Sequence, residues 1–318
     1  MNATSRAVAV GLAAALVQAV MLIAFAWPAA NIKPRELPVA VSGPAASMVA
    51  GKLAERDRDA FDITTVADEA AARTAIEQRD AYGAVVTDGG PPRVLVASAA
   101  SPAVAQQLTA IAQQMSGAPA AAVQDVVPAD PDDPRGTGFG AMVLPLVMAG
   151  IAGGVLLSLL VPTAAARSVG VLAFGIAGGL LSMVVVQTWM QLVPGSYLTL
   201  AAIAGLVSFA VAGAVTGLAT LIGRAGIGLG ALLMLLVGNP FSAATSAPEL
   251  LPQPWGAVGQ LLPPGAAATL IRSVAFFDGH GAAAPLIVLL CWAAAAVLML
   301  GAGALLPRRS PAAEPVPA

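Results

Sequence analysis

Hydrophobic residues gather in six long runs, and a polar stretch of about 110 residues separates the first run from the others. A helix needs about 20 apolar residues to cross roughly 30 Å of hydrocarbon. The pattern therefore predicts a polytopic α-helical membrane protein with six transmembrane helices. The runs are Ala7–Trp27, Gly138–Val161, Ser168–Val193, Tyr197–Ile222, Ala225–Val237 and Ala282–Leu306.

Two of these runs differ from a typical internal membrane span. The run Ala225–Val237 is short and stops at Gly238-Asn239-Pro240, whereas the other five are long enough to span. Arg6 precedes the first run and small residues follow it, as in a cleaved signal peptide. An apolar stretch of 21 residues exceeds the usual 7–15 of a signal core, so residues 1–27 are interpreted as an uncleaved signal anchor.

The polar stretch, residues 28–137, alternates between strand-like and helix-like periodicity in the order β-α-β-α-β-β-α. We predict an inserted extracytoplasmic α/β domain here, followed by a linker over Ser116–Arg135. Asp68 is a plausible helix cap, and Glu69 and Arg73 form an i,i+4 pair. The expected strands are Leu37–Val41, Phe61–Val66, Tyr82–Thr87 and Arg93–Ala97, with a tight turn at Asp88–Pro92; the expected helices begin after Ser42-Gly43-Pro44, cover Glu69–Arg79, and run from Ser101 to about Met115.

Residues 138–318 form a membrane domain of five helices, with a proline-rich segment at 239–281 before the last one. Its apolar pieces Trp255–Leu262 and Ala266–Phe277 are too short to cross, which predicts an outer re-entrant or interfacial hairpin. Trp255, Phe276 and Phe277 suit the lipid headgroup region, and we expect Arg272 to point to water.

Basic residues in the short loops predict the orientation. Arg6, Arg167, Arg224, Arg308 and Arg309 all fall on one side if the chain enters from the cytoplasm. Short cytoplasmic loops collect Lys and Arg. We therefore expect a multi-pass protein of the cell membrane with both termini in the cytoplasm, and with residues 28–137 and 239–281 outside.

Composition agrees with the membrane interpretation and argues against several kinds of partner and site. Hydrophobic residues make up 58% and charged residues 10% of the chain, and its 15 basic and 17 acidic residues nearly balance, which argues against a nucleic-acid partner. Residues 28–137 hold nine basic and 14 acidic residues, as expected of a solvated surface or, alternatively, a cationic ligand site. The single cysteine, Cys291, and the single histidine, His280, predict no disulfide and no metal site.

Several kinds of chemistry are missing from the sequence. Gly51-Lys52 is followed by Leu53 rather than Ser or Thr, so the sequence has no phosphate-binding P-loop. It also shows no pairing of a nucleophile with a base, so we predict neither an enzyme nor a bound cofactor. The six runs contain no Asp, Glu, Lys, Arg or His, which disfavours a carrier coupled to protons or ions. Gln187 and Gln191 are one helical turn apart and, with Asn239, are candidates for a transport path. Hydrogen bonding between helices is the alternative role.

Pairs of glycines four residues apart occur in four of the runs, and small residues at this spacing let helix backbones approach closely. Together they predict a tightly packed bundle. The pairs are Gly150/Gly154, Gly175/Gly179, Gly213/Gly217 and Gly226/Gly230.

The arrangement of one span, an inserted α/β domain and five further spans resembles type-2 ABC exporter permeases, in the branch that includes the phage-infection-protein family. The likeness covers nearly the whole chain. The residues that carry it are Tyr82-Gly83-Ala84-Val85-Val86, Val94-Leu95-Val96-Ala97-Ser98, Asp132-Asp133-Pro134-Arg135-Gly136, Leu261-Leu262-Pro263-Pro264-Gly265 and Leu270-Ile271-Arg272.

The resemblance implies a homodimeric permease that moves a lipid, drug or polymer while a separate cytoplasmic ATPase supplies the energy. Arg167 and Arg224 would then face that ATPase. The chain departs from the family in two places, because only six residues precede the first run and only Pro162–Arg167 joins the second and third. These departures leave a second hypothesis open, a membrane scaffold or binding protein of an envelope or secretion complex that acts through its outer domain.

Overall fold

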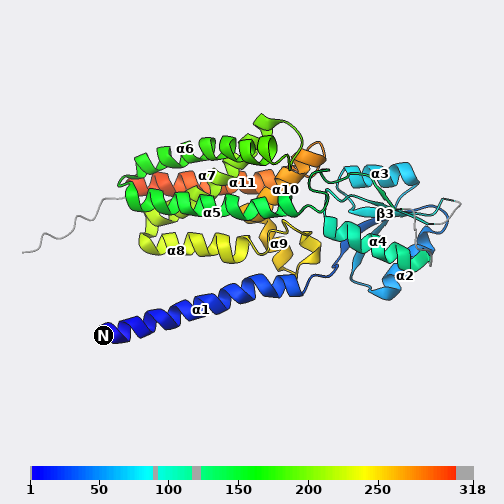
Figure 1. Cartoon of the computed structure of the whole chain (residues 1–318), viewed down its shortest axis with the longest axis horizontal. Helices are drawn as coiled ribbons and strands as arrows, with labels where there is room; N and C mark the ends of the chain where they lie inside the picture. The colour runs from blue at the N-terminus through cyan, green and yellow to red at the C-terminus, as the bar shows by residue number, and fades with distance from the viewer. Residues whose placement is uncertain (1, 89–91, 117–122, 306–318) are drawn as a thin grey trace, which may run out of the picture.

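A computed structural model describes residues 2–88, 92–116 and 123–305. The molecule is elongated, with a bundle of helices at one end and a sheet flanked by helices at the other (Figure 1). Within these residues five helices are long and apolar enough to cross a membrane, as in a multi-pass helical membrane protein. They are α1 (Ala3–Ala30), α5 (Thr137–Leu160), α6 (Ala164–Met183, continued by the π-helical η1, Val184–Trp189), α7 (Tyr197–Ile222) and α11 (Ala283–Leu305).

The predicted sixth span is shorter than the others. It is formed by the nine-residue helix α8 (Arg224–Leu232) and the six-residue π-helical η2 (Leu233–Gly238). At 1.5 Å per residue an α-helix of this length covers about 22 Å, less than the roughly 30 Å of a hydrocarbon core. In Figure 1, α8 nevertheless lies alongside α5 and carries the chain back toward the sheet end of the bundle.

Helix α7 is the centre of the bundle. Fifteen of its 26 residues are buried, whereas the other long helices keep most of their surface exposed. It packs against α5, α6, α8, α11 and α10 (Pro263–Phe276). A helix that is apolar and buried all round is the expected core of a membrane bundle.

The four glycine pairs lie where helix backbones approach α7, as predicted. A Cβ atom at Gly179 would lie 2.3 Å from the carbonyl oxygen of Ala201, and one at Gly154 would lie 2.8 Å from that of Ala212. On α7 itself, a Cβ at Gly213 would lie 2.7 Å from the Cβ of Ala296 on α11. Because such contacts leave no room for a side chain, glycine sets the spacing of α5, α6 and α11 around α7.

Helix α1 stands apart from the bundle along most of its length (Figure 1). No residue of its apolar window is buried. Its C-terminal end is the exception, since the Trp27 ring lies 6.5 Å from the Phe241 ring, which in turn stacks on Trp255 at 5.2 Å. Three aromatic side chains therefore tie the end of α1 to the segment after α8.

Among the described residues, the sheet has five strands in the spatial order β2-β1-β3-β4-β5. Strand β1 pairs in parallel with β2 and β3, β3 and β4 are antiparallel, and β4 and β5 are parallel. The strands are β1 (Leu37–Ser42), β2 (Phe61–Thr65), β3 (Gly83–Val86), β4 (Arg93–Val96) and β5 (Val123–Asp125). Helices α2 (Ala46–Arg56), α3 (Glu69–Glu77) and α4 (Pro102–Ser116) connect them.

Both faces of the sheet are covered by helices. Alternate residues of β1 and β3 point to opposite faces, as the period of two requires. Val39 and Val85 pack with α2 and α4, and Ala40 and Ala84 pack with α3. Leu250, from the segment between α8 and α11, belongs to the same core as Val39 and Val85. The sheet therefore shares a core with a segment that lies between two helices of the bundle.

The caps predicted for α3 are present. The Ala71 amide donates to the Asp68 carboxylate at 2.8 Å, and Arg73 pairs with Glu69 at 2.7 Å. Glu69 also pairs with Arg93 on β4. These hydrogen bonds, first to Arg73 and then to Arg93, lower the pKa of Glu69.

The sheet differs from the sequence-based expectation at its edge. The predicted linker Ser116–Arg135 contains strand β5, whose pairing with β4 extends the sheet. A strand of three exposed residues has no hydrophobic alternation to reveal it, and only the free edge of β4 selects this conformation. Residues 89–91 of the predicted tight turn and 117–122 of the linker lie outside the described residues, as do Leu306, Arg308 and Arg309.

The segment 239–281 is less superficial than predicted. It holds a short 3-10 turn, η3 (Pro248–Leu250), and the helices α9 (Trp255–Gln260) and α10. The prediction that Arg272 points to water is wrong, because its side chain is buried within α10. Phe277 is also buried, in the core that covers the α3 face of the sheet, instead of lying at the headgroups. Burial against α7 and the sheet outweighs the interfacial preference of these side chains.

Candidate functional site

A large apolar cavity lies between α5 and α6. Its volume is about 570 Å³, and Ser208 of α7 and Ile271 of α10 contribute to its walls. The other lining residues are apolar or glycine, except Ser182, which adds one further hydroxyl. We call this space the side cavity. Its lining residues are Gly138, Ala141, Met142, Pro145, Leu146, Ala149, Phe174, Gly178, Leu181, Ser182, Met183, Val185, Val186, Met190, Leu192, Ser208 and Ile271.

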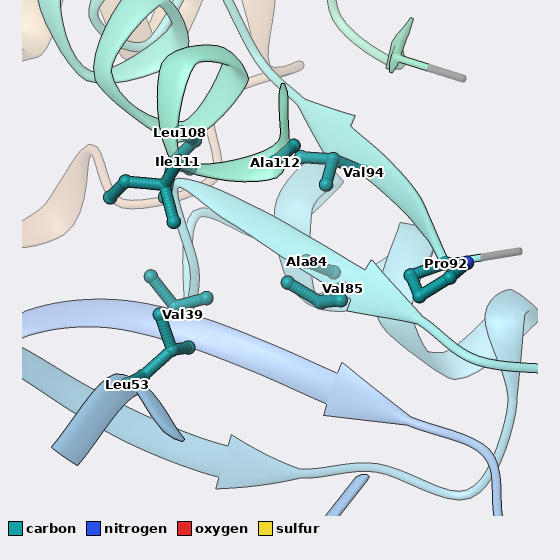
Figure 2. A pocket seen from close by; sticks show the side chains of 9 residues that line it. All are labelled: Val39, Leu53, Ala84, Val85, Pro92, Val94, Leu108, Ile111 and Ala112. Atoms are coloured by element: carbon teal, nitrogen blue, oxygen red, sulfur yellow. The ribbon is translucent and has the colours of Figure 1, made fainter. Parts of the chain in front are cut away.

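The side cavity contrasts with a small void inside the five-stranded sheet and its helices α2, α3 and α4, which we call the sheet unit. Figure 2 shows this void between the sheet and the helices α2 and α4, with Val39 and Leu53 facing Leu108 and Ile111 across it. Its volume, about 20 Å³, is enough for one water molecule, but the lining is apolar and offers a water no partners. This void is a packing defect of the core and carries no functional argument.

The structure places the three predicted path residues in different local settings. Gln187 lies within η1 and donates to the Gly195 carbonyl at 2.8 Å, while its own side-chain oxygen is buried without a partner among the described residues. Gln191 lies beyond the helix with φ +53° and is exposed. The prediction that these two lie one turn apart on a helix is therefore wrong, because the helix widens into a π-helix and ends before Gln191. Asn239 follows η2 and accepts hydrogen bonds from Ser242.

The two arginines expected to face an ATPase lie at the end of the bundle away from the sheet, but they differ in their contacts. The Arg167 guanidinium donates to the carbonyls of Ser158 and Val161, both at 2.8 Å, and to the Thr220 hydroxyl at 3.2 Å. It therefore caps the C-terminus of α5 and joins it to α7. Arg224, the first residue of α8, is exposed to solvent.

A second group of polar side chains lies where the sheet meets the bundle, and we call it the junction. Arg79 follows α3 with φ +65° and donates to the Ser273 hydroxyl and the Thr269 carbonyl of α10. Its guanidinium also lies 5.2 Å from the centre of the Phe277 ring. Burial lowers the pKa of Arg79. Arg79 thus contributes a charged side chain that links the sheet unit to α10 of the bundle.

Tyr82 and Glu249 make a second contact across the junction. The Tyr82 hydroxyl donates to the Glu249 carboxylate at 2.9 Å. Burial, with the charge of Glu249, raises the pKa of Tyr82 well above its usual range, so the hydroxyl stays protonated and remains a donor. Arg35 adds a third contact, since it donates to the Leu250 carbonyl at 2.8 Å.

Arg272 lies on the bundle side of the junction. It donates to the Ala244 carbonyl at 2.9 Å and lies 4.6 Å from the centre of the Phe139 ring. Burial, followed by repulsion from Arg79, lowers the pKa of Arg272 to about 10, so the guanidinium stays charged at neutral pH. Within the described ranges, no group of three or more His, Cys, Asp or Glu side chains forms a metal site.

Sequence reasoning missed the junction. Two signals pointed to it: Arg272 is an ionisable residue within the apolar run Ala266–Phe277, and Glu249 is the one acidic residue between Asp133 and Asp278. A charge in an apolar segment of a membrane protein is a candidate functional residue. Arg79 bonds to α10 and Tyr82 bonds to Glu249, and each lies more than 160 residues from its partner in the chain. Only the fold brings these residues together.

No family model, curated protein sequence or solved structure matches this chain.

Proposed function

We propose that this chain is the permease subunit of an ABC-type exporter, which moves an apolar molecule with energy from a separate ATPase chain. The observation that carries the proposal is the side cavity. Membrane bundles pack closely, as the glycine contacts of α7 illustrate, and a space of about 570 Å³ with an apolar lining is the kind of site that binds an apolar molecule.

The source of energy follows from what the sequence lacks. Within the helices that meet the length of a span, the charged side chains are Arg6 and Arg167, which lie near helix ends, so no chain of ionisable groups crosses the bundle. Proton-coupled carriers need such groups at membrane depth. With no P-loop in the sequence, ATP hydrolysis belongs to another subunit.

The proposal includes an arrangement in the membrane. The helix Arg224–Gly238 acts as the sixth crossing, the ends bearing Arg6, Arg167 and Arg224 are cytoplasmic, and the sheet unit lies outside. Two copies assemble, as in the exporter permeases that the sequence resembles. The loop arginines on one side of the bundle support this orientation.

Affinity purification from the native host in mild detergent tests the proposal. We expect a nucleotide-binding subunit to co-purify in stoichiometric amount. Recovery of the chain alone, or with envelope proteins and no ATPase, would contradict the proposal and favour the scaffold hypothesis.

The variant Arg224→Glu sharpens this test. Arg224 is exposed, so the change leaves the fold intact and should reduce ATPase recovery at least tenfold. Arg58→Glu, at an exposed position of the sheet unit, is the matched control and should leave recovery unchanged. Arg167 is unsuitable for this purpose because its substitution removes the cap of α5.

A further inference from the structure

The junction encloses a pocket of about 730 Å³ between the sheet unit and the bundle. This junction pocket shares no lining residue with the side cavity, so a ligand can occupy it whether or not the chain is a permease. Its walls come from both parts of the molecule: Arg79 and Tyr82 from the sheet side, and α9, α10 and the start of α11 from the bundle.

The partly buried Arg79 and the buried Arg272 of the pocket form no ion pair with a described residue. Within the described ranges, no carboxylate oxygen lies within 4.0 Å of the Arg79 or Arg272 guanidinium, and the ion pairs of the structure are those of Glu69 with Arg73 and Arg93. The charge of the Glu249 carboxylate acts to raise the pKa of Arg79, but this carboxylate accepts its hydrogen bond from Tyr82 and not from an arginine. Buried charges are stable when they are paired, so two unpaired guanidinium groups in one pocket point to an anion.

The arginines also keep hydrogen-bond donors available. Arg79 uses Nη1 for both of its bonds, and Arg272 uses Nη2 for its bond to Ala244. Their other guanidinium nitrogens make no hydrogen bond to a described residue. A guanidinium presents its donors in a planar fork that matches phosphate or carboxylate oxygens.

The other half of the pocket wall is apolar. Leu261 is 63% exposed, and Ala284, Pro285 and Val288 line the pocket from the first turns of α11. Because α11 is a membrane-spanning candidate that begins at Ala283, this wall lies where the hydrocarbon core ends. An anionic group at the arginines would thus leave an attached hydrocarbon chain along α11.

We propose that the junction pocket binds an anionic amphiphile, with its phosphate or carboxylate group between Arg79 and Arg272 and its hydrocarbon chain against Ala284, Pro285 and Val288. Three positive side chains (Arg35, Arg79 and Arg272) and two negative ones (Glu36 and Glu249) line the pocket, so an anion is favoured over a neutral headgroup. Glu249 additionally accepts a hydrogen bond from a headgroup hydroxyl.

Thermal shift and equilibrium binding of the purified full chain in neutral detergent test this site. The probes are dioctanoyl phosphatidylglycerol, dioctanoyl phosphatidylcholine with the same tails, and inorganic phosphate alone. We expect phosphatidylglycerol to bind at least tenfold more tightly than either of the others. Equal binding of both lipids would overturn the anion site, and phosphate binding as tight as that of phosphatidylglycerol would overturn the role of the tail.

Two variants locate the binding. Ala284→Trp fills the apolar half from an exposed position and should weaken phosphatidylglycerol binding at least tenfold, whereas Ala283→Trp, at the preceding exposed residue, should not. Arg79→Gln should have an effect similar to Ala284→Trp, with the exposed Arg58→Gln as its control. If Arg79→Gln does not fold, Ala284→Trp still decides the question. Unchanged affinity in Ala284→Trp would place the ligand elsewhere and overturn the proposal.

Discussion

Arginine side chains have different roles in this molecule, and the groups around each arginine determine its role. Arg167 satisfies the last carbonyls of α5, Arg79 and Arg272 line a pocket without forming an ion pair to a described residue, and Arg224 is exposed. Loop position in the sequence groups Arg167 with Arg224, but the hydrogen bonds separate them. A basic residue next to a span is thus a topology signal and can also be a helix cap.

The substitution Arg167→Ala should destabilise the bundle by about 1–3 kcal/mol, because two carbonyls at the end of α5 lose a charged donor. Arg167→Lys should recover only part of this, since an ammonium group cannot reach both carbonyls and Thr220 with one planar fork. Unfolding in detergent with a chemical denaturant measures the effect. Arg224→Ala is the control, and equal stability of all three variants would refute the capping role.

Glycine determines how close the helices come. Helix α6 comes very close to α7, and a side chain at Gly179 would collide with backbone atoms of Ala201 and Gly205. Backbone atoms cannot move aside as a flexible side chain can, so the helices must separate. Each predicted glycine pair either contacts α7 or belongs to it, so the pairs set how closely the other helices pack against α7.

The change Gly179→Ala should lower stability by about 1–3 kcal/mol through overpacking. Gly228→Ala is the matched control, because nothing lies within 4 Å of a Cβ there and alanine favours the helix. The melting temperatures of the two variants provide the comparison. A Gly179→Ala protein that melts at the wild-type temperature would show that α6 and α7 are not held at this distance.

The side cavity depends on α5 and α6 staying apart at one level of the bundle. Ala149→Phe, at an exposed position on the cavity wall, should fill part of it and weaken the binding of a neutral lipophilic dye several-fold without loss of stability. Ala152→Phe, one turn along α5 and outside the cavity wall, should bind the dye as the wild type does. Dye fluorescence titration of the purified variants tests this, and equal affinities would mean that the cavity is not the dye site.

On the scale of the whole molecule, the chain divides between an apolar bundle and a sheet unit joined by buried contacts. Leu250 and Phe277 complete the two cores of the sheet, and Arg79 and Tyr82 bond to the bundle side. These contacts make the junction a part of the fold.

The orientation can be tested with cysteines in a Cys291→Ser background. A cysteine at Asp88, an exposed position of the sheet unit, should react with a membrane-impermeant maleimide on intact cells, whereas one at the exposed Arg224 should react only after permeabilisation. Positive charges retained in cytoplasmic loops are the reason for this expectation. The reverse pattern of labelling would invert the topology and place the junction pocket on the cytoplasmic side.

The sequence was sufficient for features that depend on neighbours along the chain. The five long spans, the cap at Asp68 and the glycine pairs follow from apolar run length, local hydrogen bonding and helical spacing. It failed where a helix departed from ideal geometry, because the π-helical η1 altered the spacing on which the pairing of Gln187 and Gln191 relied.

Tertiary structure alone decided the burial of Arg272, the addition of β5 to the sheet, and both cavities. The physical reason is shared by all of them. Each depends on contacts between segments far apart in the chain, where the burial of one surface against another outweighs the preference of a single residue for water, lipid or a loop.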